Sequence, residues 1–108
     1  MNIGQIAKMA QQMQTQMAQA QQELAETTLE ATAGGGAVRV VITGAQEVRS
    51  VEIDPSAVDS DEVEMLQDLV VTAINEAIGR SKDLERERMG SIAGGMGLPG
   101  MPGLPGFG

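Results

Sequence analysis

The stretch from residue 29 to residue 55 most constrains the fold, because two breaks divide it into three short runs. Three consecutive glycines at 34–36 make the first break, since glycine adopts positive φ at little steric cost. Residues 43–46 make the second break, and β-branched residues fill the run between the two. Pro55 ends the third run because proline cannot donate to a ladder. The stretch therefore predicts a three-stranded antiparallel meander.

Alternation along these runs assigns apolar side chains to faces of the sheet. In the third run, Val48 falls on the face opposite to the two apolar residues that follow it. Either a β-bulge intervenes or both faces are partly covered. A lone three-stranded sheet is marginally stable, so we expect a helix on one face and a second copy of the chain on the other. The candidate core and dimer residues are Val38, Val40, Ile42, Val51 and Ile53.

Residues 2–26 have the pattern of one long helix. Their apolar residues follow alternating steps of three and four, which makes a heptad seam typical of packing against a partner helix. Glutamines fill most of the remaining positions. A helix of this length is about 37 Å long, so its far end is expected to project beyond the sheet or to pair with another chain. The seam consists of Ile3, Ile6, Ala10, Met13, Met17, Ala20 and Leu24.

A second helix is predicted to start near Asp61, with Asp61 as N-cap and Glu64 completing a capping box. A divalent-cation site is the alternative for this acidic cluster. An apolar stripe between Leu66 and Ile78 should pack on the sheet, and the highly charged part beyond Gly79 should project as a helix. We therefore expect a single domain over residues 1–93 and a flexible Gly/Pro-rich tail over residues 94–108.

The composition excludes most catalytic chemistry. The chain has no cysteine, so it has no thiolate nucleophile, and no histidine, the commonest acid–base residue and metal ligand. The three glycines are followed by neither a helix nor the lysine of a phosphate-binding loop. We expect no enzyme activity, no cofactor and no metal centre. No apolar run is long enough to cross a membrane, and a cytoplasmic location is expected.

Five segments resemble the YbaB/EbfC family of bacterial nucleoid-associated proteins and together cover nearly the whole chain. They are AKMAQQMQTQMAQAQQEL, GGGAVRVVITG, VEIDPSAV, EMLQDLVVTAINEAI and GGMGLPG. The resemblance implies an α+β homodimer with the order α-β-β-β-α, whose paired long helices project like the arms of tweezers. It also implies binding of double-stranded DNA with limited sequence specificity and a role in organising the nucleoid.

Cations on the predicted arms are candidates for contact with DNA phosphates rather than bases. Interleaved acidic residues leave ion pairs within the second helix as the alternative. The net charge of −8 argues against a surface that attracts phosphate everywhere. The alternative function is an acidic dimeric scaffold that binds a recombination-repair or replication protein through its Met/Gln helix and tail. The candidate DNA-binding residues are Lys8, Arg80, Lys82, Arg86 and Arg88.

Overall fold

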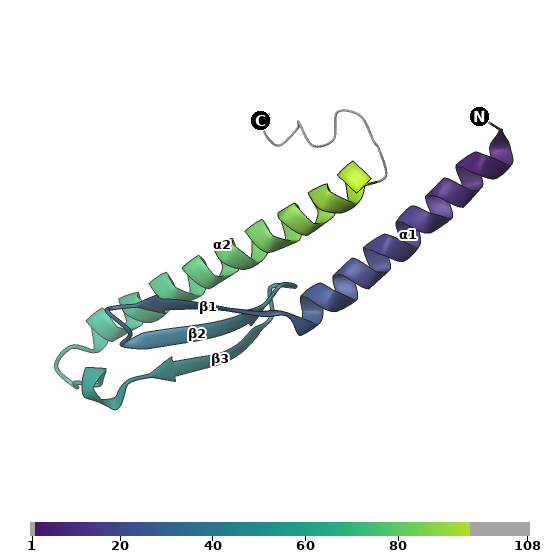
Figure 1. Cartoon of the computed structure of the whole chain (residues 1–108). Coiled ribbons are helices and arrows are strands. Elements are labelled where there is room, and N and C mark those ends of the chain that lie inside the picture. Colours follow the sequence, from purple (N-terminus) through teal and green to yellow (C-terminus); the bar gives the residue numbers. More distant parts are fainter. Residues whose placement is uncertain (1, 96–108) are drawn as a thin grey trace.

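The computed structural model describes residues 2–95 and has the expected element order (Figure 1). This order confirms the α+β class and the α-β-β-β-α arrangement. Of the predicted tail, residues 94 and 95 form the end of the second helix, and the rest lies outside the described residues. The elements are α1 (Ile3–Glu26), β1 (Thr28–Ala33), β2 (Val38–Thr43), β3 (Val48–Ile53), a 3-10 turn (Pro55–Ala57) and α2 (Val63–Gly95).

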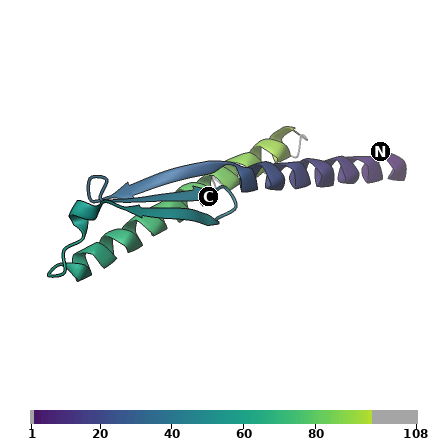
Figure 2. The same ribbon diagram turned by 90° about the horizontal axis from the view of Figure 1, so that it is seen from below.

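The sheet is an antiparallel meander with the strand order β1-β2-β3. One face carries the buried core, in which Val38, Val40 and Ile42 are completely inaccessible to solvent. Ala73 and Ala77 of α2 pack against them, and their small side chains let the helix lie close to the strands. Figure 2 shows α2 running along the sheet. Within residues 2–95, the opposite face carries no helix.

A β-bulge in β3 determines which residues share the face under α2. Val41 pairs with Ser50 but Ile42 pairs with Val48, so Arg49 is the extra residue. The bulge confirms one of the two alternatives left open by the sequence, because it brings Val48 onto the same face as Val51. Val48 therefore adds no apolar surface to the opposite face, where Val41 lies among polar and charged residues, and the second copy expected there stays a prediction.

The apolar residues of β3 lie beyond the reach of α2, which covers β1 and β2. Val48, Val51 and Ile53 remain 40%, 41% and 38% exposed. Val51 and Ile53, candidates for core or dimer packing, thus lie outside the core of the single chain, because the helix does not cover all three strands. An exposed apolar stripe follows β3 on the side of the sheet that α2 occupies.

The turn between β2 and β3 connects the sheet to both helices. The backbone N–H of Gly44 donates to the carbonyls of Leu24 (2.9 Å) and Thr27 (3.0 Å) at the end of α1. On α2, the buried Ser81 hydroxyl donates to the Thr43 carbonyl (2.6 Å). The same oxygen accepts from the backbone N–H (3.1 Å) and side-chain amide (2.9 Å) of Gln46, whose φ is +60°. The end of α1 and the middle of α2 therefore both meet this turn.

The two helix starts differ in how well the sequence predicts them. The expected helix start at residue 2 is confirmed, where the structure shows a capping box between Asn2 and Gln5, and α1 ends at Glu26 as expected. The box predicted at Asp61 is absent, because α2 begins at Val63 and the Asp61 N–H instead donates to the Asp59 carboxylate (2.9 Å). The Asp59 side chain thus forms an Asx turn with the backbone two residues on, and this turn takes the place of the predicted cap.

Both helices extend beyond the sheet at the same end of the molecule (Figure 1). The described chain measures 69 × 27 × 16 Å and has a radius of gyration of 19.3 Å, against about 13 Å for a compact domain of 100 residues. Of the predicted heptad seam, only Ala20 and Leu24 near the sheet are buried, and Ile3 is 84% exposed. We call the parts of the two helices that extend beyond the sheet the α1 arm (residues 3–19) and the α2 arm (residues 82–95).

We predict that Gly44→Ala destabilises the protein while Gly79→Ala does not. A Cβ at residue 44 would lie 2.8 Å from Leu24 Cδ2 and 2.9 Å from the Leu24 carbonyl oxygen, so α1 would have to move. We expect a loss of about 1–3 kcal/mol in the free energy of unfolding. A Cβ at residue 79 meets nothing within 4 Å, and alanine there should stabilise α2 by up to about 1 kcal/mol. Urea denaturation of both variants measures the difference, and equal stabilities would contradict the role of the turn.

Candidate nucleic-acid interface

The five candidate cations do not form a single cluster. Lys8 lies on the exposed α1 arm, whereas Arg88 on the α2 arm ion-pairs with Glu23 and therefore faces α1. Lys82 and Arg86 are four residues apart on α2, so they share a face of that helix. The candidates thus lie along two helices rather than in one basic patch.

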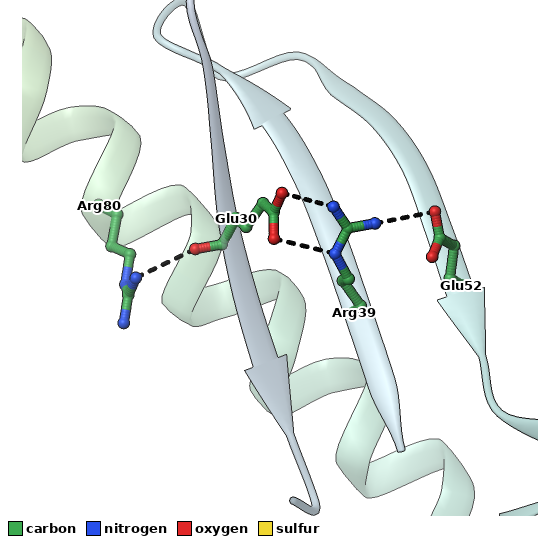
Figure 3. A network of polar contacts seen from close by, with 4 residues as sticks. All are labelled: Glu30, Arg39, Glu52 and Arg80. Carbon is green, nitrogen blue, oxygen red and sulfur yellow. Dashed lines mark hydrogen bonds and ion pairs between the residues drawn. The ribbon is translucent and has the colours of Figure 1, made fainter. Parts of the chain in front are cut away.

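Arg80 is not on an arm, although the sequence suggested it. Its guanidinium donates to the backbone carbonyl of Glu30 in β1 (3.1 Å) and to the carboxylate of Glu76 on its own helix (2.9 Å). Figure 3 shows this arginine turned toward the edge of the sheet. Arg80 therefore fastens α2 to β1, and the arm begins beyond the buried Ser81.

Two of the arm arginines also have carboxylate partners. Arg86 ion-pairs with Asp83 at 2.8 Å, and Arg88 bridges to Glu23 across the two helices. The Arg86–Asp83 pair is an ion pair within the second helix of the kind that the sequence left as an alternative, whereas Arg88 pairs with a residue of the other helix. Exposed pairs of this kind contribute about 0–1 kcal/mol, so a phosphate can compete for either arginine.

Lys8 and Lys82 are the cations with most freedom to bind an anion. Both side chains are exposed, and neither has an ion pair with any residue from 2 to 95. An ammonium group on a flexible stem binds a phosphate as a point charge without a fixed approach direction. These two lysines are thus better placed for phosphate contact than the arginines.

Glutamines line two open hollows along the α1 arm. The first has a volume of about 530 Å³ and is lined by Lys8, Gln11, Gln12, Thr15 and Gln16. The second, of about 370 Å³, lies between the arms and is lined by Gln16, Gln19, Arg88, Ser91 and Ile92. Gln16 belongs to both, so they form one polar surface that we call the glutamine furrow. No carboxylate is among its lining residues.

Charge is distributed very unevenly along the chain. Residues 1–22 contain no acidic residue, and all fifteen aspartates and glutamates lie from Glu23 onward. Residues 50–79 contain eight acidic residues and no lysine or arginine, so this segment accounts for the whole net charge of −8. The remaining residues carry seven charges of each sign. Because residues 50–79 include β3 and the start of α2, the acidic charge lies toward the end opposite the arms.

The polar face of the sheet holds one arginine between two carboxylates (Figure 3). Arg39 donates from Nε to Glu30 Oε1 (2.9 Å) and from Nη1 to Glu52 Oε2 (2.9 Å), and a second bond from Nη2 reaches Glu30 Oε2. The hydrogen bonds that Arg39 donates to Glu30 and Glu52 raise the pKa of Arg39, and the bonds from Arg39 lower the pKa of Glu30. With its donors engaged, Arg39 is a structural cation rather than a candidate for DNA contact.

Two other kinds of site find no support in the described part of the chain. Within residues 2–95 there is no group of three or more histidine, cysteine, aspartate or glutamate residues placed to hold a metal ion. The acidic residues around Asp61 thus form no such cluster. None of the described helices has the length and apolar character needed to span a membrane.

Comparison with known proteins places this chain among DNA-binding proteins of bacteria. The model of the YbaB/EbfC DNA-binding family matches residues 1–96. A nucleoid-associated protein of Chloroflexus aurantiacus is 52% identical over 96 residues, which cover 89% of this chain and 96% of that protein. Another, from Ruminiclostridium cellulolyticum, is 46% identical over 100 residues, covering 92% and 87%. These descriptions denote nucleoid-associated, DNA-binding proteins rather than enzymes.

A solved structure supports the fold. The crystal structure of an uncharacterized protein from Helicobacter pylori matches with a TM-score of 0.72, covering 81% of this chain and 91% of that one. The two sequences are 22% identical. At this level of identity the match shows a shared fold and nothing further.

We predict that the contribution of Glu30 to stability disappears at acidic pH. Its folded-state pKa lies below the ordinary value of 4.5, so its contribution is present above pH 4.5 and is lost as the pH falls through the folded-state pKa. Glu30→Gln should therefore be less stable than the unchanged protein at neutral pH and equal to it in acid. Denaturation at a series of pH values measures this difference. In an Arg39→Gln background the same change should have little pH-dependent effect, and a persistent effect would assign it to another partner.

Proposed function

Because this chain belongs to the YbaB/EbfC DNA-binding family, we propose that it binds double-stranded DNA through its two arms and helps to organise the bacterial chromosome in the cytoplasmic nucleoid. The distribution of charge is the observation that favours the arms as the DNA-binding site. The α1 arm has no acidic residue, and the glutamine furrow has no carboxylate in its lining. A polyanion can therefore approach the α1 arm and the furrow without facing a carboxylate, whereas Asp83, Glu85 and Glu87 lie among the cations of the α2 arm.

Phosphate contact is the mode of binding that these side chains favour. Lys8 and Lys82 supply cations, and Arg86 and Arg88 can exchange their carboxylate partners for phosphates. Glutamine amides donate hydrogen bonds to phosphate and sugar oxygens without adding charge. Contacts of these kinds orient a protein on the duplex but carry little sequence information, so we infer limited sequence specificity.

Duplex DNA is favoured over a single strand. Proteins that bind single strands without sequence preference stack bases on aromatic side chains. The sequence has one aromatic residue, Phe107, which lies outside the described residues. The arms therefore offer polar and charged contacts to a backbone and no platform for stacked bases.

A homodimer is the assembly that the exposed stripe on β3 favours. Val48, Val51 and Ile53 form contiguous apolar surface next to α2, and such surface on a small domain indicates an interaction site. A two-fold contact between two stripes would bury both at once. It would also double the number of arms, and two linked binding sites raise the apparent affinity for one duplex.

We predict that replacing the two unpaired lysines weakens binding to every duplex by a similar factor. Each phosphate-binding lysine that is removed should flatten the slope of log K against log salt by about 0.9. Fluorescence anisotropy of Lys8→Gln/Lys82→Gln on two unrelated duplexes, over a series of salt concentrations, measures affinity and slope. Arg39→Gln is the matched control, because it removes a cation from the sheet face and should leave the slope unchanged.

Two results would contradict this site. If the double lysine variant binds as the unchanged protein does, with the same slope, the arm lysines do not contact phosphates. If it loses affinity on one duplex and keeps it on the other, the lysines read bases. The companion variant Arg86→Gln/Arg88→Gln tests the arginines, and an unchanged slope would leave them as partners of Asp83 and Glu23.

We predict that Val51→Asp gives a folded monomer. The side chain is 41% exposed in the single chain, so a charge is tolerated there, whereas burial between two copies would leave it unpaired. Light scattering should show the mass of one chain, and circular dichroism an unchanged helix content. Val40→Asp places the charge in the core and should unfold the chain, and Thr32→Asp on the exposed polar face should change neither property. If the unchanged protein is itself a monomer by light scattering, the proposed homodimer is wrong.

A further inference from the structure

A hollow of about 350 Å³ lies at the end of the molecule opposite the arms. The β1–β2 turn, the 3-10 turn and the first turns of α2 enclose it. Its apolar lining includes Ala37 from the hairpin, Ala57 from the 3-10 turn, and Met65, Leu66 and Leu69 from α2. We call it the end hollow. None of the candidate DNA-binding residues lines it.

Gly34 shapes one wall of the end hollow. Its φ is +65°, and a Cβ there would lie 2.9 Å from Leu69 Cδ1. The glycine therefore lets the turn close over Leu69 without displacing it. Met65, which also belongs to the lining, is 57% exposed, so a flexible thioether side chain stands at the opening. Methionine at an opening adapts to differently shaped apolar groups.

The opening of the end hollow is strongly acidic. Asp59 and Glu62 belong to its lining. They lie within residues 50–79, which contain eight acidic residues and no lysine or arginine. Neither carboxylate forms an ion pair with any residue from 2 to 95. An apolar floor with unneutralised carboxylates at its edge is complementary to an apolar side chain flanked by cations.

We propose that the end hollow is a docking site for a basic peptide segment of another protein. An apolar side chain of that segment packs on Leu66 and Leu69, and its neighbouring lysines or arginines pair with Asp59 and Glu62. The site lies opposite the arms, so a protein held there leaves them free for DNA. The proposal depends on the hollow alone and does not rest on the proposed DNA contacts.

Charge argues against the other possible occupants. A two-fold contact between copies at this end would place one acidic opening against another. Among residues 2–95, the most basic segment is 80–88, in which four lysines and arginines are offset by three acidic residues. DNA is repelled by the acidic opening for the same reason. A partner with a clearly basic segment satisfies both the apolar floor and the charged edge.

The test measures binding of a short fluorescent peptide in which two leucines are flanked on both sides by arginines. We expect the full-length protein to bind it and to bind a peptide with serines in place of the leucines less tightly. Asp59→Asn/Glu62→Gln should weaken binding of the leucine peptide by about tenfold, because neither carboxylate can then pair with an arginine. Asp61→Asn/Glu64→Gln removes the same charge from positions outside the lining and should change binding little.

A third variant separates packing from charge. Ala57→Phe, at a half-buried position on the wall, should fill the hollow. It should weaken binding of the leucine peptide and leave the weak binding of the serine peptide unchanged. Circular dichroism establishes that each variant is folded. If Ala57→Phe fails to fold, Met65→Gln at the exposed opening replaces it, with the same expected result.

Four results would overturn the proposal. Equal binding of the leucine and serine peptides would show attraction by charge alone. Equal losses in the two double variants would show that no particular carboxylates are used. A change in mass by light scattering in the lining variants would make the hollow an interface between copies of this chain. Displacement of the peptide by a duplex would place the hollow within the DNA-binding surface.

Discussion

The β2–β3 turn is the contact on which the rest of the structure depends. Gly44 brings the turn against the end of α1, and Ser81 fastens the same turn to the middle of α2. A larger residue at 44 would displace Leu24, and an apolar residue at 81 would remove the hydroxyl that links α2 to Thr43 and Gln46. Beyond these anchors the helices leave the sheet, so the turn sets the direction of both arms.

The bulge at Arg49 determines which surface of the sheet is left for a second copy of the chain. It reverses the alternation of β3 at one point and puts Val48 on the same face as Val51. The sheet therefore has one apolar face and one polar face. On the polar face, Arg39 forms ion pairs with the carboxylates of Glu30 and Glu52. Because α2 covers only β1 and β2, the surface available to a second copy is a stripe beside the helix rather than a whole face of the sheet.

Separation of charge explains how an acidic chain can serve a DNA-binding family. The molecule is 69 Å long, whereas the Debye length at physiological salt is about 8 Å. Carboxylates near the start of α2 are therefore screened from a phosphate at the arms, and the total charge of −8 says little about either end. The two ends have different chemistry, one rich in amides and the other in carboxylates around an apolar hollow.

The sequence by itself determined the class, the order of the elements, the bounds of the first helix and the alternation within β1 and β2. These features depend on residues close together in the chain, where glycine breaks, β-branched runs and helical spacing act directly. It also placed Lys8 and Lys82 on helices that leave the sheet. Only the tertiary structure decided the bulge, the fastening of Arg80 to β1 and the pairing of Arg88 with Glu23. Each of these joins residues from different elements, and strand register and helix position are set by the packing of the whole core rather than by any local pattern.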